Sequence, residues 1–258
     1  MTSRYAFLLY AILLLLPVEV GLLLWPAPGS GAVSETVDNS IYTDLLGRYV
    51  KDGLVDYAGF KRDESRLNAY LKILEEIRPQ SLSREEQLAL YINAYNAWTI
   101  KLVLSAYPGI RSIKEIGPFW STPWRKEFIP LEGRTLSLDD IEHGIIRQRF
   151  KDSRIHFAVN CASKSCPPLA GKPYRGEKLN ARLDAVTRAF VNDPRNNRLE
   201  GETLYVSKIF EWYAADFESG VVSFFLKYGD ETLIKALENG QDRIKIKYLD
   251  YDWSLNSQ

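Results

Sequence analysis

Apolar residues recur at helical spacing in two long stretches of the chain. The first stretch predicts a helix that ends before Pro79 and whose inner face carries Leu67, Tyr70, Leu71, Leu74 and Ile77. The second begins at Ser83 and Glu86, which are spaced as a capping box, and runs to about Tyr107, where Pro108 and Gly109 follow. Because apolar side chains cover almost every side of this second helix, we expect it to be largely buried.

Two asparagines interrupt the apolar surface of the second helix. Asn93 and Asn96 lie three positions apart and therefore on one side of it. Buried amides need hydrogen-bond partners, so the favoured interpretation is that these side chains tie the helix to the backbone of a neighbouring loop. The alternative is a place in an active site, where an amide orients a histidine or polarises a carbonyl group. Under either interpretation we expect both asparagines to be largely buried and at least one to bond to the loop that follows residue 159.

The later part of the chain carries shorter patterns. Residues 155–159 are apolar except for His156, which predicts a strand buried on both faces. Ser137 and Asp140 predict the start of a helix through about Arg147, with Glu142 beside its inner face. Residues 243–248 alternate, which predicts a strand with Ile244, Ile246 and Tyr248 turned inward. Helices early and strands later predict an α+β fold with a small mixed or antiparallel sheet.

The first 32 residues differ from the rest of the chain. Arg4 precedes an apolar run from Ala6 to Trp25, and small residues follow up to Ala32. This pattern is typical of a secretory signal peptide, and we expect cleavage after Ala32 and an exported, periplasmic protein. The alternative is an uncleaved inner-membrane anchor with the domain outside the cytoplasm, because the run is about long enough to span a bilayer. Residues 33–258 are expected to form one globular domain.

Composition narrows the function without naming it. Of the 258 residues 46% are hydrophobic, which is enough for a sizeable core, and the 33 basic residues balance the 33 acidic ones. A balanced charge gives no indication of a nucleic-acid partner, and membrane contact is expected only through the N-terminal segment if it stays uncleaved. No cofactor is indicated by any motif.

Candidate chemistry is concentrated in residues 155–169, with the sequence IHFAVNCASKSCPPL. This segment contains both cysteines of the chain, Cys161 and Cys166, and one of its two histidines, His156. A buried element that leads into a polar loop is a common way to present reactive side chains. A second candidate is the aromatic loop 117–130, whose Trp120 and Trp124 form a ligand platform if exposed and a cover for the core if folded down.

Four separated motifs resemble one protein family. YINAYNAWTI, LDDIEHGIIR, IHFAVNCASKSCPPL and YLDYDWSLN, in this order, are similar to the domain-of-unknown-function 547 (DUF547) family of bacteria and plants. The resemblance covers most of residues 33–258. It implies a papain-like or transglutaminase-like fold, in which a helix packs on an antiparallel sheet, and it supplies no activity by itself.

A thiol enzyme is the first of three alternatives for this segment. The residues would be Cys166 as nucleophile, His156 as base and Asn96 or Glu142 as the orienting group, with acyl transfer or amide hydrolysis on an envelope peptide or protein as the reaction. The sequence departs from the papain pattern, because prolines follow Cys166 and the long buried helix contains no cysteine. His156 alone resembles the histidine of that arrangement.

The other two alternatives give the cysteines a structural role. A Cys161–Cys166 disulfide, favoured by an oxidising compartment, would make the chain a non-catalytic envelope binding domain whose ligand contacts come from Trp120, Trp124 and Asn93. A zinc ion held by His156, Cys161, Cys166 and His143 fits less well, because the ligand spacing is not a standard one, and we predict no metal site.

Overall fold

The computed structural model describes residues 36–118, 120–240 and 243–258. The predicted signal peptide, residues 1–32, lies outside them. Within the described residues no helix is long and apolar enough to cross a bilayer. The longer helices are α1 (Ser40–Tyr49), α2 (Tyr57–Arg62), α3 (Glu64–Glu76), α4 (Arg84–Leu104), α6 (Leu179–Val191), α8 (Val221–Tyr228) and α9 (Glu231–Gly240).

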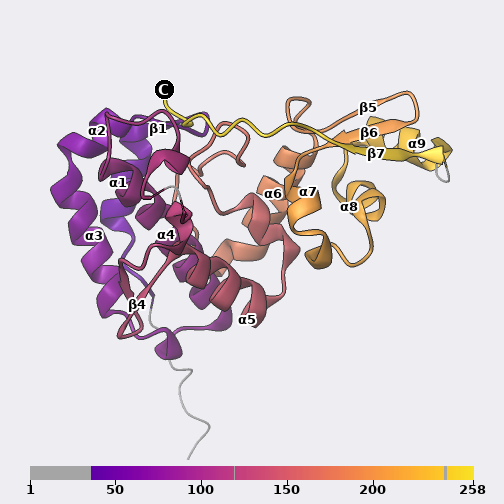
Figure 1. Cartoon of the computed structure of the whole chain (residues 1–258). Coiled ribbons are helices and arrows are strands. Elements are labelled where there is room, and N and C mark those ends of the chain that lie inside the picture. Colours follow the sequence, from indigo (N-terminus) through magenta and orange to yellow (C-terminus); the bar gives the residue numbers. More distant parts are fainter. Residues whose placement is uncertain (1–35, 119, 241–242) are drawn as a thin grey trace, which may run out of the picture. The chain divides into compact units, whose positions relative to one another are not determined.

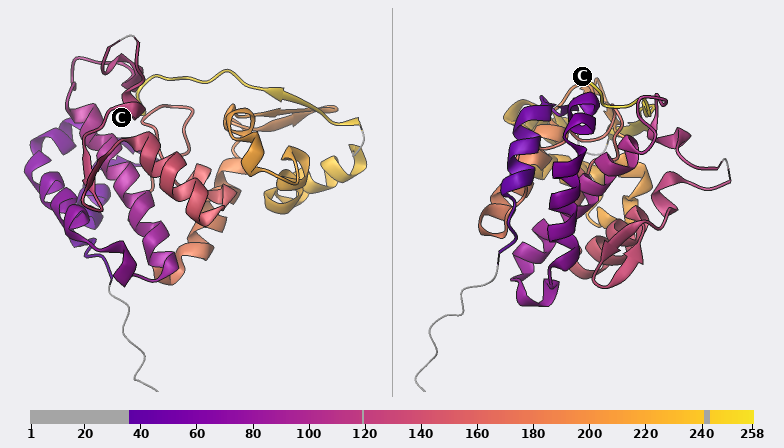
Figure 2. Two further views of the ribbon diagram at one scale, coloured as in Figure 1. Left: turned by 60° about the horizontal axis from the view of Figure 1, so that its bottom comes forward. Right: turned by 90° about the vertical axis from the view of Figure 1, so that its left-hand side faces the viewer.

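The first core forms around α4, which packs against α2, α3 and α6 (Figures 1 and 2). The predicted start of α4 is confirmed, since the Ser83 side chain accepts a hydrogen bond from Glu86 N. The Glu86 carboxylate instead bonds to the backbone N–H groups of Val37 and Gly176, which attaches two remote segments to the first turn of α4. The helix is buried along almost its whole length, as its apolar pattern predicted.

The strands form three small sheets. Antiparallel hairpins are made by β1 (Val50–Lys51) with β2 (Leu54–Val55) and by β3 (Ile129–Leu131) with β4 (Arg134–Leu136). The third sheet has the order β5 (Arg198–Glu200), β6 (Thr203–Val206), β7 (Lys245–Tyr248), with β5 antiparallel and β7 parallel to β6. This mixed sheet, together with the helices, confirms the predicted α+β class.

The predicted inward face of the last strand is wrong. β7 forms as expected, but Ile246 is 37% and Tyr248 is 38% exposed, and of the three side chains only Ile244, which precedes the strand, packs against a core. A second, mainly aromatic core forms on β6, α7 (Ile209–Trp212) and α8 instead, with Phe210 and Phe225 fully buried.

The predicted strand at residues 155–159 is also wrong. Residues Ser153–Phe157 form the 3-10 helix η5, although Ile155 to Val159 are all buried as expected. The backbone after η5 bonds to the side chain of Asn96 on α4 rather than to a neighbouring strand. The apolar run therefore indicated burial correctly and the backbone conformation incorrectly.

The last ten residues return from β7 to the α1–α2 region as an extended segment (Figure 1). Along this path the segment follows residues 160–169, which we call the cysteine loop. There Lys164 N donates to Ser254 O at 2.9 Å and Asn256 N donates to Ala162 O at 3.2 Å. It ends beside β2, where Gln258 N donates to Val55 O at 3.1 Å. The C-terminal segment thus fixes the loop that contains both cysteines.

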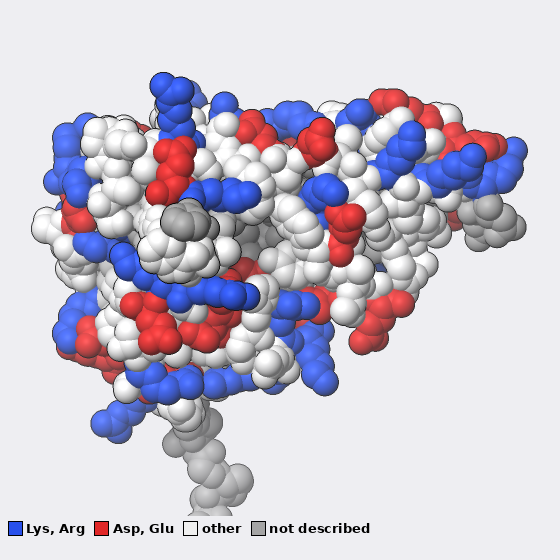
Figure 3. Space-filling view, in the orientation of Figure 1, with Lys and Arg blue, Asp and Glu red and all other residues white. Residues whose placement is uncertain are grey.

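Lysine and arginine side chains are interspersed with aspartate and glutamate on the face shown in Figure 3. No single sign of charge dominates this face, as the balanced composition predicted.

Candidate active site

One cavity of about 270 Å³ brings together most of the chemistry that the sequence indicated. Its wall includes both cysteines, both histidines, two carboxylates and several aromatic rings: Cys161, Cys166, His143, His156, Asp139, Glu142, Tyr95, Tyr213, Tyr251, Trp124, Trp212 and Trp253. We call this cavity the thiol pocket. Its residues come from α4, η4 (Asp140–Arg147), η5, the cysteine loop, α7 and the C-terminal segment.

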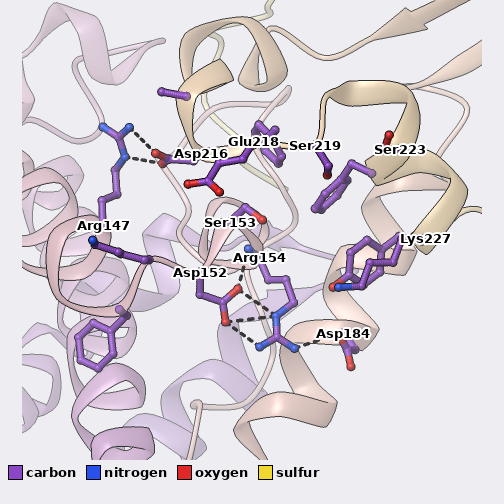
Figure 4. Close-up of a pocket in the computed structure, with 16 residues that line it drawn as sticks. Arg147, Asp152, Ser153, Arg154, Asp184, Asp216, Glu218, Ser219, Ser223 and Lys227 are labelled. Atoms are coloured by element: carbon purple, nitrogen blue, oxygen red, sulfur yellow. Dashed lines mark hydrogen bonds and ion pairs between the residues drawn. The ribbon is translucent and has the colours of Figure 1, made fainter.

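His156 is held at the inner wall of the thiol pocket by a carboxylate. Its side chain is only 1% exposed, and its Nε2 lies 2.7 Å from Oδ2 of Asp216, at the end of η7 (Ala214–Asp216). Arg147 binds the same carboxylate through two hydrogen bonds of 2.6 and 2.9 Å (Figure 4). The His156 hydrogen bond, followed by those from Arg147, holds the pKa of Asp216 well below its usual range despite partial burial. An ionised carboxylate can only accept a hydrogen bond, so Nε2 of His156 carries the hydrogen and donates it to Asp216.

The other ring nitrogen of His156 is left without a partner. Nδ1 is buried and makes no hydrogen bond to the described residues, and Oε1 of Glu142 is 4.0 Å away. The ring stacks on Tyr213 with 3.9 Å between centroids, which fixes its plane. With the hydrogen on Nε2, Nδ1 presents a lone pair in the wall of the thiol pocket, as a general base requires.

The predicted Cys161–Cys166 disulfide is not formed, and both cysteines are free thiols. Cys161 N donates to Sγ of Cys166 at 2.8 Å, so the sulfur of Cys166 is directed at the backbone of Cys161. Sγ of Cys161 instead lies 3.2 Å from Oγ of Ser163 and 3.3 Å from the hydroxyl of Tyr251. The sulfur of Cys161 thus faces two hydroxyl groups, whereas that of Cys166 faces a backbone N–H group.

The two thiols differ in acidity. Burial acts to raise the pKa of Cys161, but hydrogen bonds from Cys166, Ser163 and Tyr251 lower it below its ordinary value. Burial raises the pKa of Cys166 well above its ordinary value, and the neighbouring Cys161 raises it further. Cys166 is also the less accessible of the two, at 8% exposure, whereas Cys161 is half-buried. The arrangement therefore favours Cys161 over Cys166 as the reactive thiolate.

Both asparagines of α4 tie the helix to loop backbone, as predicted. Asn93 is 2% exposed, donates to Tyr174 O at 2.9 Å and accepts from Tyr174 N at 2.8 Å. Asn96 is 3% exposed, donates to Ala158 O at 3.0 Å and accepts from Asn160 N at 2.8 Å. Neither amide lines the thiol pocket. Asn96 acts on the site only by holding the backbone that leads into Cys161.

Glu142 and His143 reach the pocket from η4, which has π-helical geometry, a conformation that is often found at functional sites. The predicted helix start is confirmed by three hydrogen bonds. The Ser137 hydroxyl donates to the Asp140 carboxylate, the same carboxylate accepts from Ser137 N, and the Ser137 hydroxyl accepts from Asp140 N. Nδ1 of His143 lies 3.1 Å from Nη1 of Arg147, and its Nε2 lies 3.8 Å from Oδ1 of Asp139.

The two tryptophans of loop 117–130 are separated in the structure. Trp124 lines the thiol pocket and packs against Trp253 at 5.5 Å between ring centroids. Trp120 is 74% exposed and does not line the pocket. The zinc arrangement is not present either, since no group of His, Cys, Asp or Glu among the described residues is placed to hold a metal ion.

Comparison with known proteins gives one match. Residues 79–191 match a family described as "Protein of unknown function, DUF547". The match covers this central part of the chain, from the turn before α4 to the end of α6. No curated protein and no solved structure matches the chain, so the papain-like or transglutaminase-like relationship stays an expectation.

The matched range includes His156, both cysteines and Glu142, but it ends before other parts of the pocket. Asp216, Tyr213 and Tyr251 lie beyond the matched range, and sequence reasoning did not single them out. The segment around Asp216 was notable only for its aromatic residues. A carboxylate at the end of a short turn has no local signal that connects it to a histidine 60 positions earlier.

A second, larger cavity of about 900 Å³ is shown in Figure 4. Arg147 and Asp216 line this cavity, as do Arg154 and its partners Asp152 and Asp184. Asp216 therefore lines this cavity and also holds His156, which lines the thiol pocket.

Proposed function

We propose that this DUF547 chain is a cysteine-dependent enzyme that catalyses acyl transfer or amide hydrolysis. The observation that carries the proposal is that the wall of one cavity holds both a thiol of lowered pKa and a histidine whose Nδ1 is free and whose Nε2 is held by an ionised carboxylate. Cys161 is the nucleophile, His156 the base, and Asp216 the residue that orients His156. The sequence indicated two other orienting candidates. Oε1 of Glu142 lies 4.0 Å from Nδ1 of His156, too far for a direct hydrogen bond, and Asn96 bonds to the backbone of Ala158.

The reaction follows from these roles. The Cys161 proton passes to Nδ1 of His156, and the thiolate attacks the carbonyl carbon of the substrate to form a C–S bond. The bond between the carbonyl carbon and the leaving group then breaks, and the leaving group takes the proton from His156. Water or another acceptor gives a proton to His156 and attacks the thioester, which releases the acyl product and the Cys161 thiolate. Asp216 stabilises the positive imidazolium that forms twice in this cycle.

The substrate class and the compartment belong to the same proposal. An apolar N-terminal run followed by small residues supports export, and an envelope peptide or protein is then the substrate. A cavity of about 270 Å³ suits one side chain or chain end rather than a whole folded partner. N-terminal sequencing of the mature protein tests the export step, since an intact Met1 on a cytoplasmic product would contradict it.

Acylation by p-nitrophenyl acetate tests the proposed chemistry directly. Because the chain has two cysteines, Cys166→Ala leaves only Cys161 and Cys161→Ala leaves only Cys166. We expect one acetyl group, removable by hydroxylamine, on the wild type and on Cys166→Ala, and none on Cys161→Ala over the same time. Rapid acetylation of Cys161→Ala, or equal labelling of both thiols, would contradict the assignment of the nucleophile.

A binding domain without chemistry is the second candidate. The aromatic wall of Trp124, Trp212 and Trp253 favours it, because such rings retain ligands whether or not a reaction follows. In that case neither single-cysteine variant would be acetylated faster than the unfolded protein.

A further inference from the structure

The thiol pocket contains a buried carboxylate that no fixed cation neutralises. Glu142 is 4% exposed, its carboxylate accepts a hydrogen bond from the Tyr213 hydroxyl, and among the described residues no lysine or arginine lies within 4.0 Å of it. Arg147 acts on Glu142 only from a greater distance, because its guanidinium group is bound to Asp216. Of the described lysines and arginines, only Arg125 lines the pocket, and it is 76% exposed and faces Asp139. Buried charges are ordinarily paired, so the surroundings of Glu142 indicate a cation from outside the chain.

The position of this cation follows from a neighbouring nitrogen that has no partner among the described residues. Nδ1 of His156 is buried without a hydrogen bond and lies 4.0 Å from Oε1 of Glu142. That separation is too long for a direct hydrogen bond. A nitrogen with two N–H donors placed at about 2.9 Å from each atom would bridge them. An ammonium group has three such donors and a positive charge, so it satisfies the carboxylate and the imidazole together.

The rest of the pocket wall suits a carbon chain attached to that ammonium. The rings of Trp124, Trp212 and Tyr251 all pack against Trp253, at 5.5, 5.6 and 4.6 Å between centroids. Methylene groups bury apolar area against such a surface, and ring faces attract cations as well. Lys114 of the same chain illustrates the second effect, with Nζ 4.5 Å above the ring of Trp253.

We propose that the thiol pocket binds a primary alkylammonium group, of the kind that ends a lysine side chain. The ammonium lies between Glu142 and His156, and the methylene stem lies along the aromatic wall. An ammonium placed here occupies the Nδ1 lone pair that accepts the Cys161 proton in the proposed function, so the inferred ligand competes with acylation of Cys161, and its binding requires no thiol chemistry.

Titration of the full chain with n-pentylammonium chloride, followed by tryptophan fluorescence and calorimetry, tests the proposal. n-Pentanol supplies the same carbon chain without charge, and tetramethylammonium supplies the charge without N–H donors. We expect pentylammonium to bind at least about tenfold more tightly than either, because a hydrogen bond from an ammonium to a carboxylate is stronger than one between neutral groups. Equal binding of pentanol would overturn the proposal, and equal binding of tetramethylammonium would overturn the bridging position.

Two variants locate the site. Glu142→Gln keeps the shape of the side chain and is expected to weaken pentylammonium binding at least about tenfold. Glu238→Gln removes an exposed carboxylate from α9 and serves as the matched control, with unchanged binding expected. Unchanged affinity in Glu142→Gln would overturn the proposal. If that variant does not fold, the binding of the three probes to the wild type tests the proposal instead.

The fate of the proposed function is measured separately. Pentylammonium binding is measured on the wild type without p-nitrophenyl acetate, so the binding and acetylation results are independent. Binding without any acetylation of Cys161 would remove the enzyme proposal and leave the ligand site. Acetylation of Cys161 without pentylammonium binding would remove the ligand site and leave the enzyme proposal.

Discussion

Asp216→Asn is expected to slow acylation of Cys161 by p-nitrophenyl acetate about 10²–10⁴-fold, the usual contribution of a general base. An ionised Asp216 fixes the hydrogen of His156 on Nε2 and leaves the lone pair on Nδ1. An asparagine can present its NH₂ group to Nε2, which would reverse the tautomer and remove the base from the pocket. The substitution also removes the charged partner of Arg147, so a lower melting temperature is expected as well.

Asp184→Asn is the matched control for this experiment. Asp184 also binds an arginine, with Arg154 Nη1 at 2.9 Å from its Oδ1, and it lines the same larger cavity as Asp216. It has no contact with a histidine, so we expect acylation of Cys161 to be unchanged in Asp184→Asn. Wild-type acylation in Asp216→Asn would show that Asp216 does not set the state of His156, and the proposed roles would then be wrong.

The pH dependence of stability gives an independent measurement on Asp216. Its pKa is depressed in the folded protein, chiefly by His156 and also by Arg147. A carboxylate with a depressed folded pKa stabilises the fold above its unfolded pKa of about 3.9 and loses that contribution as the pH falls through the folded value. Asp216→Asn should therefore cost stability at neutral pH, and this difference from the wild type should shrink in strong acid.

Local sequence signals predicted those parts of the fold that depend on local forces. The Ser83–Glu86 cap, the stop before Pro79 and the buried faces of α3 and α4 all follow from residues within a few positions of each other. The burial of Asn93 and Asn96 followed as well, because two amides within an otherwise apolar surface require internal partners. Which backbone groups those partners are could not be predicted from the same stretch.

The site depends on contacts between distant residues, and there the sequence was less informative. An apolar run is compatible with a buried strand or a buried 3-10 turn, and at Ile155–Val159 the amide of Asn96 decides between them by taking the backbone groups that a strand would pair. Tyr251 reaches Cys161 from 90 positions away and contributes to its low pKa. The choice of Cys161 over Cys166 depends on such contacts, which spacing and composition do not encode.

The cysteine loop itself is expected to depend on Asn96. Asn96→Ala leaves Ala158 O and Asn160 N without their partners, and both residues are buried, at 5% and 4% exposure. Each orphaned buried group costs about 1–3 kcal/mol. In a domain of this size about 1 kcal/mol corresponds to roughly 2–4 °C, so we expect the melting temperature to fall by several degrees.

Asn68→Ala is the control, because Asn68 is exposed on α3 and alanine is the better helix former. Its melting temperature should equal or slightly exceed that of the wild type. Asn160 directly precedes Cys161, so Asn96→Ala should also slow acylation of Cys161 at temperatures where the variant is folded. Asn93→Ala should cost similar stability, because its amide holds Tyr174, but it should leave acylation closer to the wild type. A melting temperature for Asn96→Ala equal to that of Asn68→Ala would show that the loop is held by its other contacts, above all by the C-terminal segment.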